Sequence, residues 1–285
     1  MNTTGQLKIG VVAPAGRITP ETAARVEALA ATYYPKDRLE IVFHPQCFAS
    51  DGHFAGNDAF RTQAFLEFAN DPGIDALWWA RGGYGSARLA EAIMPSLSDG
   101  CIAKTYLGYS DAGSLLAVLY SRGCERVTHG PMVNDMNRQD GDAAVLRALA
   151  WLVDSDPAAL EPSLIDATAP VAAFNMSTLC HLIGTPFQPD LTGHVLMLEE
   201  VSEHLYRIDR LMFQITSNEA LRRVAGIRLG RCSDVPPNDP EFGMTALQIV
   251  QHWCRRSGIA WLGPADIGHD IANKVVPFGR QSSVK

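Results

Sequence analysis

The chain has 285 residues, of which 47% are hydrophobic and 19% charged, and its formal net charge is -7 at pH 7. This length suffices for one large domain or two modest ones, each with its own hydrophobic core. The negative charge, without any run of lysine and arginine, argues against a nucleic-acid-binding protein, which would present a basic face. We expect small molecules or peptides as partners instead.

The sequence indicates neither secretion nor membrane insertion. Its N-terminal segment lacks a basic region followed by a long apolar stretch. No segment approaches the roughly 18 apolar residues that a membrane span needs. The six cysteines are scattered, without a CxxC or other metal-like spacing. Unpaired, reduced cysteines are typical of cytoplasmic proteins, so we expect a cytoplasmic location.

In the first half of the chain, strand-like and helix-like segments alternate. Apolar strands are predicted at 7–14, 39–45, 74–80, 105–108 and 126–131, and helices begin near residues 19, 57, 86 and 111. This alternation indicates a parallel sheet that is covered by helices on both faces. Ligands of such sheets bind in the loops at the carboxyl ends of the strands, where we expect the functional site.

A polar, proline-containing stretch at 154–163 follows a predicted helix over 141–154 and reads as a linker. Beyond it, strands are predicted at 195–200 and 225–232, and helices at 203–221 and 241–258. We therefore predict two domains, residues 1–155 and residues 165–285.

Three glycines follow the third strand, in the stretch LWWARGGYGSARL at 77–89. Glycine permits positive φ angles, so that several backbone N–H groups can point at an anion. The spacing matches neither a dinucleotide-binding fingerprint nor a phosphate-binding P-loop. The glycines could equally serve only a tight turn. Arg81 within the turn favours a ligand, because its planar guanidinium suits a carboxylate.

Ser110 lies where the fourth strand meets the next helix, in the sequence GYSDA. The pattern resembles the nucleophile elbow of hydrolases, although Ala112 replaces the last glycine of GxSxG. Free N–H groups at the start of the helix could stabilise an oxyanion beside the serine. Alternatively, Ser110 and Asp111 could simply cap the helix, since both residue types cap well.

Glu199 and Glu200 directly follow an apolar strand, and His269 follows a glycine in a loop. Alone, such glutamates are usually solvated or capping, and a lone histidine is more often structural. Together with Ser110 they supply a nucleophile, a general base and a carboxylate that can orient the base. Strand register decides which glutamate faces the histidine, because a shift of one residue exchanges the two faces.

Seven short motifs occur in the order found in LD-carboxypeptidases. They are VVAPAG, RGGYG, GYSD, HGP, GTPF followed by PDL, LEEVSEHLYRIDR, and GH followed by PFG, and they extend from about residue 8 to residue 279. The chain resembles this family of serine peptidases, which also contains the microcin C self-immunity peptidases. The resemblance implies an α/β fold: a flavodoxin-like parallel-sheet N-terminal domain and a smaller β-rich α/β C-terminal domain, with the site between them.

The same resemblance implies roles for individual residues. The family's nucleophile falls on Ser110 and its histidine on His269. The oxyanion-hole donors are backbone N–H groups, which fall on Gly83 in RGGYG and on Asp111 after the serine. This agrees with the separate interpretation of both turns.

The family's acid falls in the LEE motif, on Glu199. Glu200 stands where the family often has aspartate, so either could be the triad acid. Glu203 matches a different glutamate of the family, which precedes YRIDR.

The resemblance also implies an activity. Members release terminal D-alanine from muropeptide tetrapeptides by hydrolysing the L,D-amide bond, during cell-wall recycling in the cytoplasm. They need no metal or other cofactor and are commonly homodimers. A carboxypeptidase must also recognise a free carboxylate, for which the chemistry of Arg81 makes it our candidate.

Two alternatives differ in class. A microcin C-type immunity peptidase would cleave peptidyl- or aminoacyl-nucleotide conjugates, but the chain shows no aromatic-bearing insertion for gripping a nucleotide. A non-catalytic protein that binds small molecules would use Ser110 only as a helix cap and His269 only structurally. The length of the peptide substrate and its diamino acid are left open by the sequence.

Overall fold

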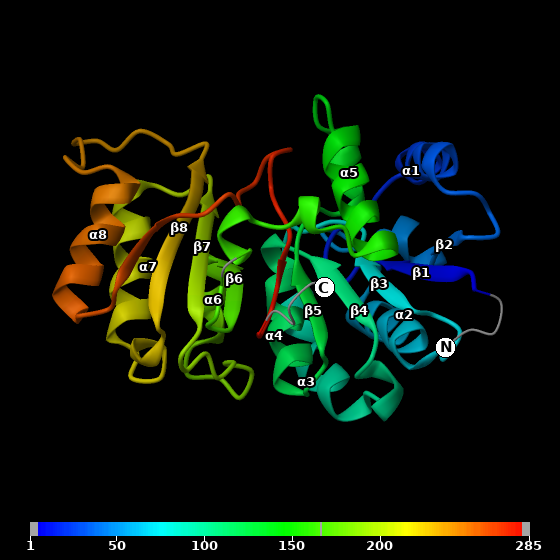
Figure 1. Cartoon of the computed structure of the whole chain (residues 1–285), viewed down its shortest axis with the longest axis horizontal. Coiled ribbons are helices and arrows are strands. Elements are labelled where there is room, and N and C mark those ends of the chain that lie inside the picture. Colours follow the sequence, from blue (N-terminus) through cyan, green and yellow to red (C-terminus); the bar gives the residue numbers. More distant parts are fainter. Residues whose placement is uncertain (1–4, 166, 281–285) are drawn as a thin grey trace.

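The computed structural model describes residues 5–165 and 167–280, in which two β-sheets lie side by side (Figure 1). The first sheet has six strands in the order β10-β5-β4-β3-β1-β2. Strands β1 to β5 are parallel, and their order 2-1-3-4-5 is that of flavodoxin-like folds. The strands are β1 (Leu7–Val12), β2 (Leu39–Phe43), β3 (Ala76–Trp79), β4 (Thr105–Gly108), β5 (Arg126–His129) and β10 (Val276–Pro277).

Helices cover both faces of this sheet: α1 (Pro20–Tyr33), α2 (Asp58–Asn70), α3 (Ala90–Ile93), α4 (Gly113–Ser121) and α5 (Asp142–Leu149). Successive strand residues point to opposite faces. Trp78 accordingly packs in the core beneath α1 and α5, and Trp79 in the core beneath α2, α3 and α4. The predicted α/β architecture is confirmed.

Local signals explain where several helices begin and end. The side chain of Thr19 accepts a hydrogen bond from the N–H of Thr22 at the start of α1, and Asn57 caps α2 in the same way. The helix predicted from residue 86 is instead a 3-10 turn (Ser86–Leu89) followed by the short α3, because Pro95 cannot continue a helix. Among the described residues, no helix has the length and apolar character to cross a bilayer.

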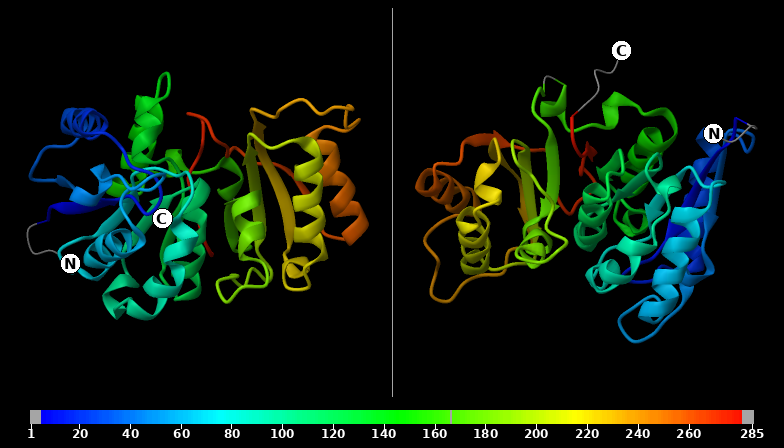
Figure 2. Two further views of the ribbon diagram at one scale, coloured as in Figure 1. Left: turned by 180° about the vertical axis from the view of Figure 1, so that it is seen from behind. Right: turned by 90° about the horizontal axis from the view of Figure 1, so that it is seen from below.

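The second sheet has four parallel strands in the order β6-β7-β8-β9. They are β6 (Val171–Asn175), β7 (Val195–Val201), β8 (Gly226–Ser233) and β9 (Trp261–Pro264), accompanied by helices α6 (Met176–Leu182), α7 (Leu205–Ser217) and α8 (Ala246–Ser257). Figure 2 shows α7 and α8 side by side at the end of the molecule away from the first sheet. This half of the chain is therefore also a parallel α/β layer.

The C-terminal segment hydrogen-bonds to both sheets. Strand β10 pairs antiparallel with β5, and the N–H of Phe278 donates to the carbonyl of Val127 at 2.8 Å. One residue later, Gly279 exchanges two backbone hydrogen bonds with Val171 of β6, at 2.9 and 3.0 Å. In Figure 1 this segment, drawn in red, runs between the two sheets.

The stretch predicted as a linker is ordered. It forms two 3-10 turns, Pro157–Ala159 and Pro162–Leu164, and the N–H of Glu161 between them donates to the carbonyl of Val275 at 2.9 Å. The division into domains at this stretch stays a prediction.

Candidate active site

Ser110 lies in a sharp turn between β4 and α4. Its φ angle is 61°, in the left-handed region, where a non-glycine residue costs about 1–3 kcal/mol. A Cβ atom on Gly108 would lie 2.9 Å from the Cβ of Ala112, so glycine is required just before the turn. This strand–turn–helix arrangement is the geometry of a nucleophile elbow.

Ser110 does not cap a helix in this structure. A 3-10 turn (Ser110–Ala112) precedes α4, and neither its N-cap residue, Tyr109, nor that of α4, Ala112, makes a side-chain capping bond. The backbone carbonyl of Ser110 accepts from the N–H of Gly113 and from the hydroxyl of Thr178, the latter at 3.4 Å.

The glycine-rich turn after β3 packs directly on Ser110. A Cβ atom on Gly82 would lie 3.0 Å from both the Cβ and the Oγ of Ser110, so only glycine fits there without displacing the serine. Gly83 has a φ of 118° and Gly85 a φ of 135°, both unfavourable for other residues. The structure thus brings together two turns that the sequence analysis identified separately.

Asp111 connects these two turns through its side chain. Its buried carboxylate accepts hydrogen bonds from the backbone N–H groups of Gly85, at 3.3 Å, and Ser86, at 2.9 Å. From the sequence, Asp111 was expected either to donate its backbone N–H to an oxyanion or to cap the helix. The side chain additionally fixes the glycine turn against the serine.

The structure pairs His269 with Glu199. Glu199 lies in β7 and is fully buried, and its Oε2 is 2.5 Å from Nδ1 of His269. Burial lowers the pKa of His269, but the charge of Glu199 and its hydrogen bond outweigh this effect, so the pKa lies above its ordinary value. Nε2, the other ring nitrogen, has no hydrogen-bond partner within the described residues.

The other two glutamates have different partners. The buried Glu200 accepts bonds from Nδ2 of Asn175 at 2.6 Å, from the N–H and hydroxyl of Ser177 at 2.9 and 2.8 Å, and from its neighbour's backbone N–H. Burial raises the pKa of Glu200, and these bonds oppose the rise. Glu203 forms an ion pair with Arg207. Of the three, only Glu199 contacts His269.

Tyr109, directly before the serine, connects the two halves of the site. The centroid of its ring lies 5.0 Å from that of His269. The serine hydroxyl and Nε2 of His269 do not bond to each other here, and such bonds are often long before substrate binds. Residues from both sheets therefore meet around Ser110.

A second group of polar residues, not predicted from the sequence, supports Tyr109. Its hydroxyl donates to Oδ1 of Asp135 at 2.8 Å, and the same oxygen accepts from Nε of Arg138 at 2.9 Å. The other oxygen of Asp135 accepts from the N–H of Met132 at 2.8 Å. The polar stretch 134–138 follows β5, and that position after a strand was the available signal.

The loop that carries His269 is held from both sides. Arg231 of β8 forms ion pairs with Asp266, at 2.5 Å, and with Asp270. Oδ1 of Asn273 accepts from the N–H of Gly268 at 3.1 Å and from Nε2 of His129 at 3.2 Å. Burial lowers the pKa of His129 to about 4, so this histidine is neutral near pH 7.

Arg81, the predicted carboxylate-binding residue, is exposed beside the glycine turn. Its Cδ lies 3.1 Å from the position of a Cβ atom on Gly16, so the side chain extends over the loop after β1. Within the described residues it makes no hydrogen bond or ion pair.

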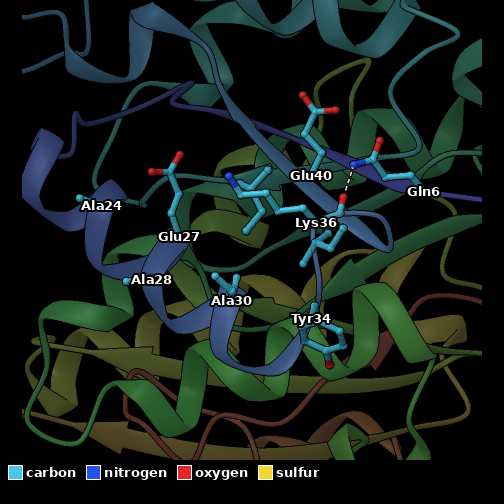
Figure 3. A pocket seen from close by; sticks show the side chains of 11 residues that line it. Gln6, Ala24, Glu27, Ala28, Ala30, Tyr34, Lys36 and Glu40 are labelled. Atoms are coloured by element: carbon cyan, nitrogen blue, oxygen red, sulfur yellow. Dashed lines mark hydrogen bonds between the residues drawn. The ribbon is translucent and has the colours of Figure 1, made fainter.

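A cavity of about 690 Å³ lies elsewhere, between α1 and β2 (Figure 3). Alanines of α1 line it together with Tyr34, Lys36 and Glu40, and none of the residues around Ser110 contributes. We therefore treat it as separate from the candidate site.

Two family models match the chain: the LD-carboxypeptidase N-terminal domain over residues 9–130 and the LD-carboxypeptidase C-terminal domain over residues 168–284. A protein of Synechocystis sp. that is named as a carboxypeptidase is 31% identical over 251 residues, 86% of this chain and 81% of that protein. A murein tetrapeptide carboxypeptidase of Pseudomonas aeruginosa is 23% identical, over 96% of this chain and 91% of that protein.

Among solved structures, a microcin C7 self-immunity protein in complex with aspartyl sulfamoyl adenosine has a TM-score of 0.77 at 18% identity. The match covers 97% of this chain and 92% of that chain, and it shows that the fold is shared. The two family models account for both halves of the sequence, and a relative at 31% identity extends over most of it. This chain therefore belongs to the LD-carboxypeptidase family of peptidases.

Proposed function

We propose that the protein is a serine-type LD-carboxypeptidase that releases terminal D-alanine from muropeptide tetrapeptides. The observation that carries the proposal is the hydrogen-bonded pair of Glu199 and His269, which packs against Tyr109, the residue before Ser110. The φ of 61° at Ser110 is the strained conformation of a nucleophile elbow. Membership of a carboxypeptidase family, and a relative named for murein tetrapeptides, support the substrate.

In the proposed reaction, Nε2 of His269 takes the proton of Ser110 while Oγ attacks the carbonyl carbon of the L,D-amide. The backbone N–H groups of Gly83 and Asp111 stabilise the oxyanion that forms. When this intermediate collapses, the amide C–N bond breaks, and His269 passes its proton to the leaving amine of D-alanine. Water, deprotonated by His269, then attacks the acyl carbon, the ester bond to Oγ breaks, and His269 returns the proton to Ser110.

Glu199 fixes the histidine in this scheme. Its carboxylate accepts from Nδ1, which leaves Nε2 as the basic nitrogen that faces the substrate. The negative charge of Glu199 stabilises the imidazolium that forms in each half-reaction, inside a site where water cannot screen it.

Arg81 is a candidate partner for the terminal carboxylate, since it is cationic and follows the same strand as Gly83. The proposed triad needs no metal or other cofactor. The family resemblance further suggests a cytoplasmic homodimer, which light scattering of the purified protein would test.

The direct experiment incubates UDP-muramyl tetrapeptide with wild type and with Ser110→Ala, followed by mass spectrometry. Loss of one alanine with wild type only is the expected result, and an all-L tetrapeptide should resist. Equal cleavage by both proteins would reject Ser110 as the nucleophile.

If wild type leaves the tetrapeptide intact, the substrate assignment is wrong. Aminoacyl sulfamoyl adenosine, the class of ligand bound by the structurally similar immunity protein, is then the substrate to assay. Its cleavage would assign the chain to the immunity-type peptidases.

A further inference from the structure

Arg138 presents a partly exposed cation next to the candidate site. It follows a 3-10 turn (Val133–Asn137) beyond β5, and its side chain is 40% exposed. Nε bonds to Asp135, which is buried and also bonded to Tyr109 and to the backbone at Met132. The guanidinium carries four further N–H groups on its two terminal nitrogens.

The position of Arg138 relative to the histidine follows from these contacts. Asp135 bonds to both Arg138 and the hydroxyl of Tyr109, and the ring of Tyr109 packs against the ring of His269. Burial lowers the pKa of His269, Glu199 raises it above its ordinary value, and the positive charge of Arg138 opposes that rise. The guanidinium thus lies within electrostatic reach of the imidazole.

The reaction determines on which side a carboxylate-binding group must lie. His269 gives its proton to the leaving amine, so the scissile nitrogen must come close to Nε2. Only two bonds, N–Cα and Cα–C, separate that nitrogen from the terminal carboxylate carbon, together less than about 3 Å of chain. The cation that binds the carboxylate must therefore lie on the histidine side of Ser110, not on the oxyanion side.

We propose that Arg138 binds the terminal carboxylate of the substrate through its terminal nitrogens, with Asp135 holding the guanidinium in place. This assignment rests on the proposed function and adds its specificity-determining residue. Arg81 is less suited, because it lies at the oxyanion turn and not on the histidine side of Ser110. Its side chain extends over Gly16 without a partner among the described residues, so substrate binding would have to order the whole side chain.

The test compares two substrates that differ only at the terminal group: the muramyl tetrapeptide acid and its D-alaninamide. Wild type, Arg138→Gln, Arg138→Lys and Arg81→Gln, which tests the competing candidate, are assayed on both substrates. Arg255→Gln, at an exposed position of α8, is the control. Each substrate is also tested as an inhibitor of the other's cleavage, so a preference is measurable even if the amide is not turned over. Thermal unfolding of each variant checks its fold.

We expect wild type to prefer the acid, and Arg138→Gln to lower kcat/KM for the acid by roughly 30-fold or more while changing the amide little. The preference for the acid should then disappear. Arg138→Lys keeps the charge but not the planar fork, and should retain an intermediate preference. Arg81→Gln should keep the wild-type preference.

Four results would overturn the assignment. Equal losses on acid and amide in Arg138→Gln would make Arg138 a structural support only. A lost preference in Arg81→Gln, but not in Arg138→Gln, would transfer the role to Arg81. If wild type cleaves neither substrate, the proposed function itself fails and this assignment with it, whereas cleavage with an unchanged preference in Arg138→Gln rejects this assignment alone.

Discussion

The carboxylate of Asp111 accepts a hydrogen bond from the backbone N–H of Ser86 at 2.9 Å, across the two turns that flank the candidate nucleophile. Asp111→Asn keeps the size of the side chain but loses one of its acceptor oxygens. We expect a loss of stability of about 1–3 kcal/mol from the unsatisfied N–H group. We also expect kcat to fall roughly 10²-fold, because the oxyanion donors shift.

Urea unfolding and steady-state kinetics measure these two effects separately. Asp37→Asn, at an exposed position before β2, is the control and should change neither. A destabilised Asp111→Asn protein with wild-type kcat would show that the connection between the turns serves folding only.

Gly83→Ala tests the backbone donor in the glycine turn. A Cβ atom there would make only ordinary contacts, the nearest at 3.9 Å. The substitution is therefore strained by the φ of 118° and not by a steric clash. The peptide group must rotate to relieve this backbone strain, and the N–H of residue 83 then no longer points at the oxyanion. We expect kcat to fall about 10²–10³-fold with a smaller change in KM. Gly184→Ala, with a φ of 79° and open space around it, imposes comparable backbone strain away from the site and should leave kcat unchanged.

The pH dependence of kcat/KM should report the pairing of Glu199 with His269. The histidine acts as a base only when neutral, and its pKa is raised above the ordinary value of about 6.5. Activity should therefore increase with pH through an apparent pKa above that value. In Glu199→Gln the raising charge is gone while burial still lowers the pKa, so the acid limb should move to lower pH as the maximal rate falls. An acid limb at the wild-type position in Glu199→Gln would contradict this pairing.

Glu200→Gln is the counterpart to Glu199→Gln in the same strand. Glu200 accepts four hydrogen bonds, three from residues at the start of α6 and one from the N–H of Val201 in β7, and glutamine keeps only one of the two acceptor oxygens. We expect a loss of stability of about 1–3 kcal/mol. The acid limb of the pH profile should shift less than in Glu199→Gln, because the charge of Glu200 contributes less than Glu199 to the raised pKa of His269. Guanidinium unfolding and the pH profile distinguish the two variants, and a larger shift of the acid limb in Glu200→Gln than in Glu199→Gln would reverse the assignment of the triad acid.

The sequence was sufficient to predict the parts of the fold that depend on local signals. Strands β1 to β3 are short and mostly apolar runs, and Thr19 and Asn57 cap the helices that they were expected to begin. Strand β10 could not be predicted, because two residues, Val276 and Pro277, give no periodic pattern and pair with a strand far away in the chain.

The site shows the same limit. The period-two pattern of β7 places Glu199 and Glu200 on opposite faces but does not say which face meets the histidine. Asp135 was not identified, because its hydroxyl partner, Tyr109, is 26 residues away in the sequence. Such relationships depend on tertiary packing and become visible only in the folded structure.

The C-terminal segment has a consequence for how the site opens. The histidine loop leads directly into β10, whose neighbours Phe278 and Gly279 donate their amide protons to Val127 in one sheet and Val171 in the other. The loop cannot detach from Ser110 by much without breaking these bonds. Amide hydrogen exchange at Phe278 and Gly279 should therefore require the same local unfolding that disassembles the triad, and its rate gives the free energy of that opening.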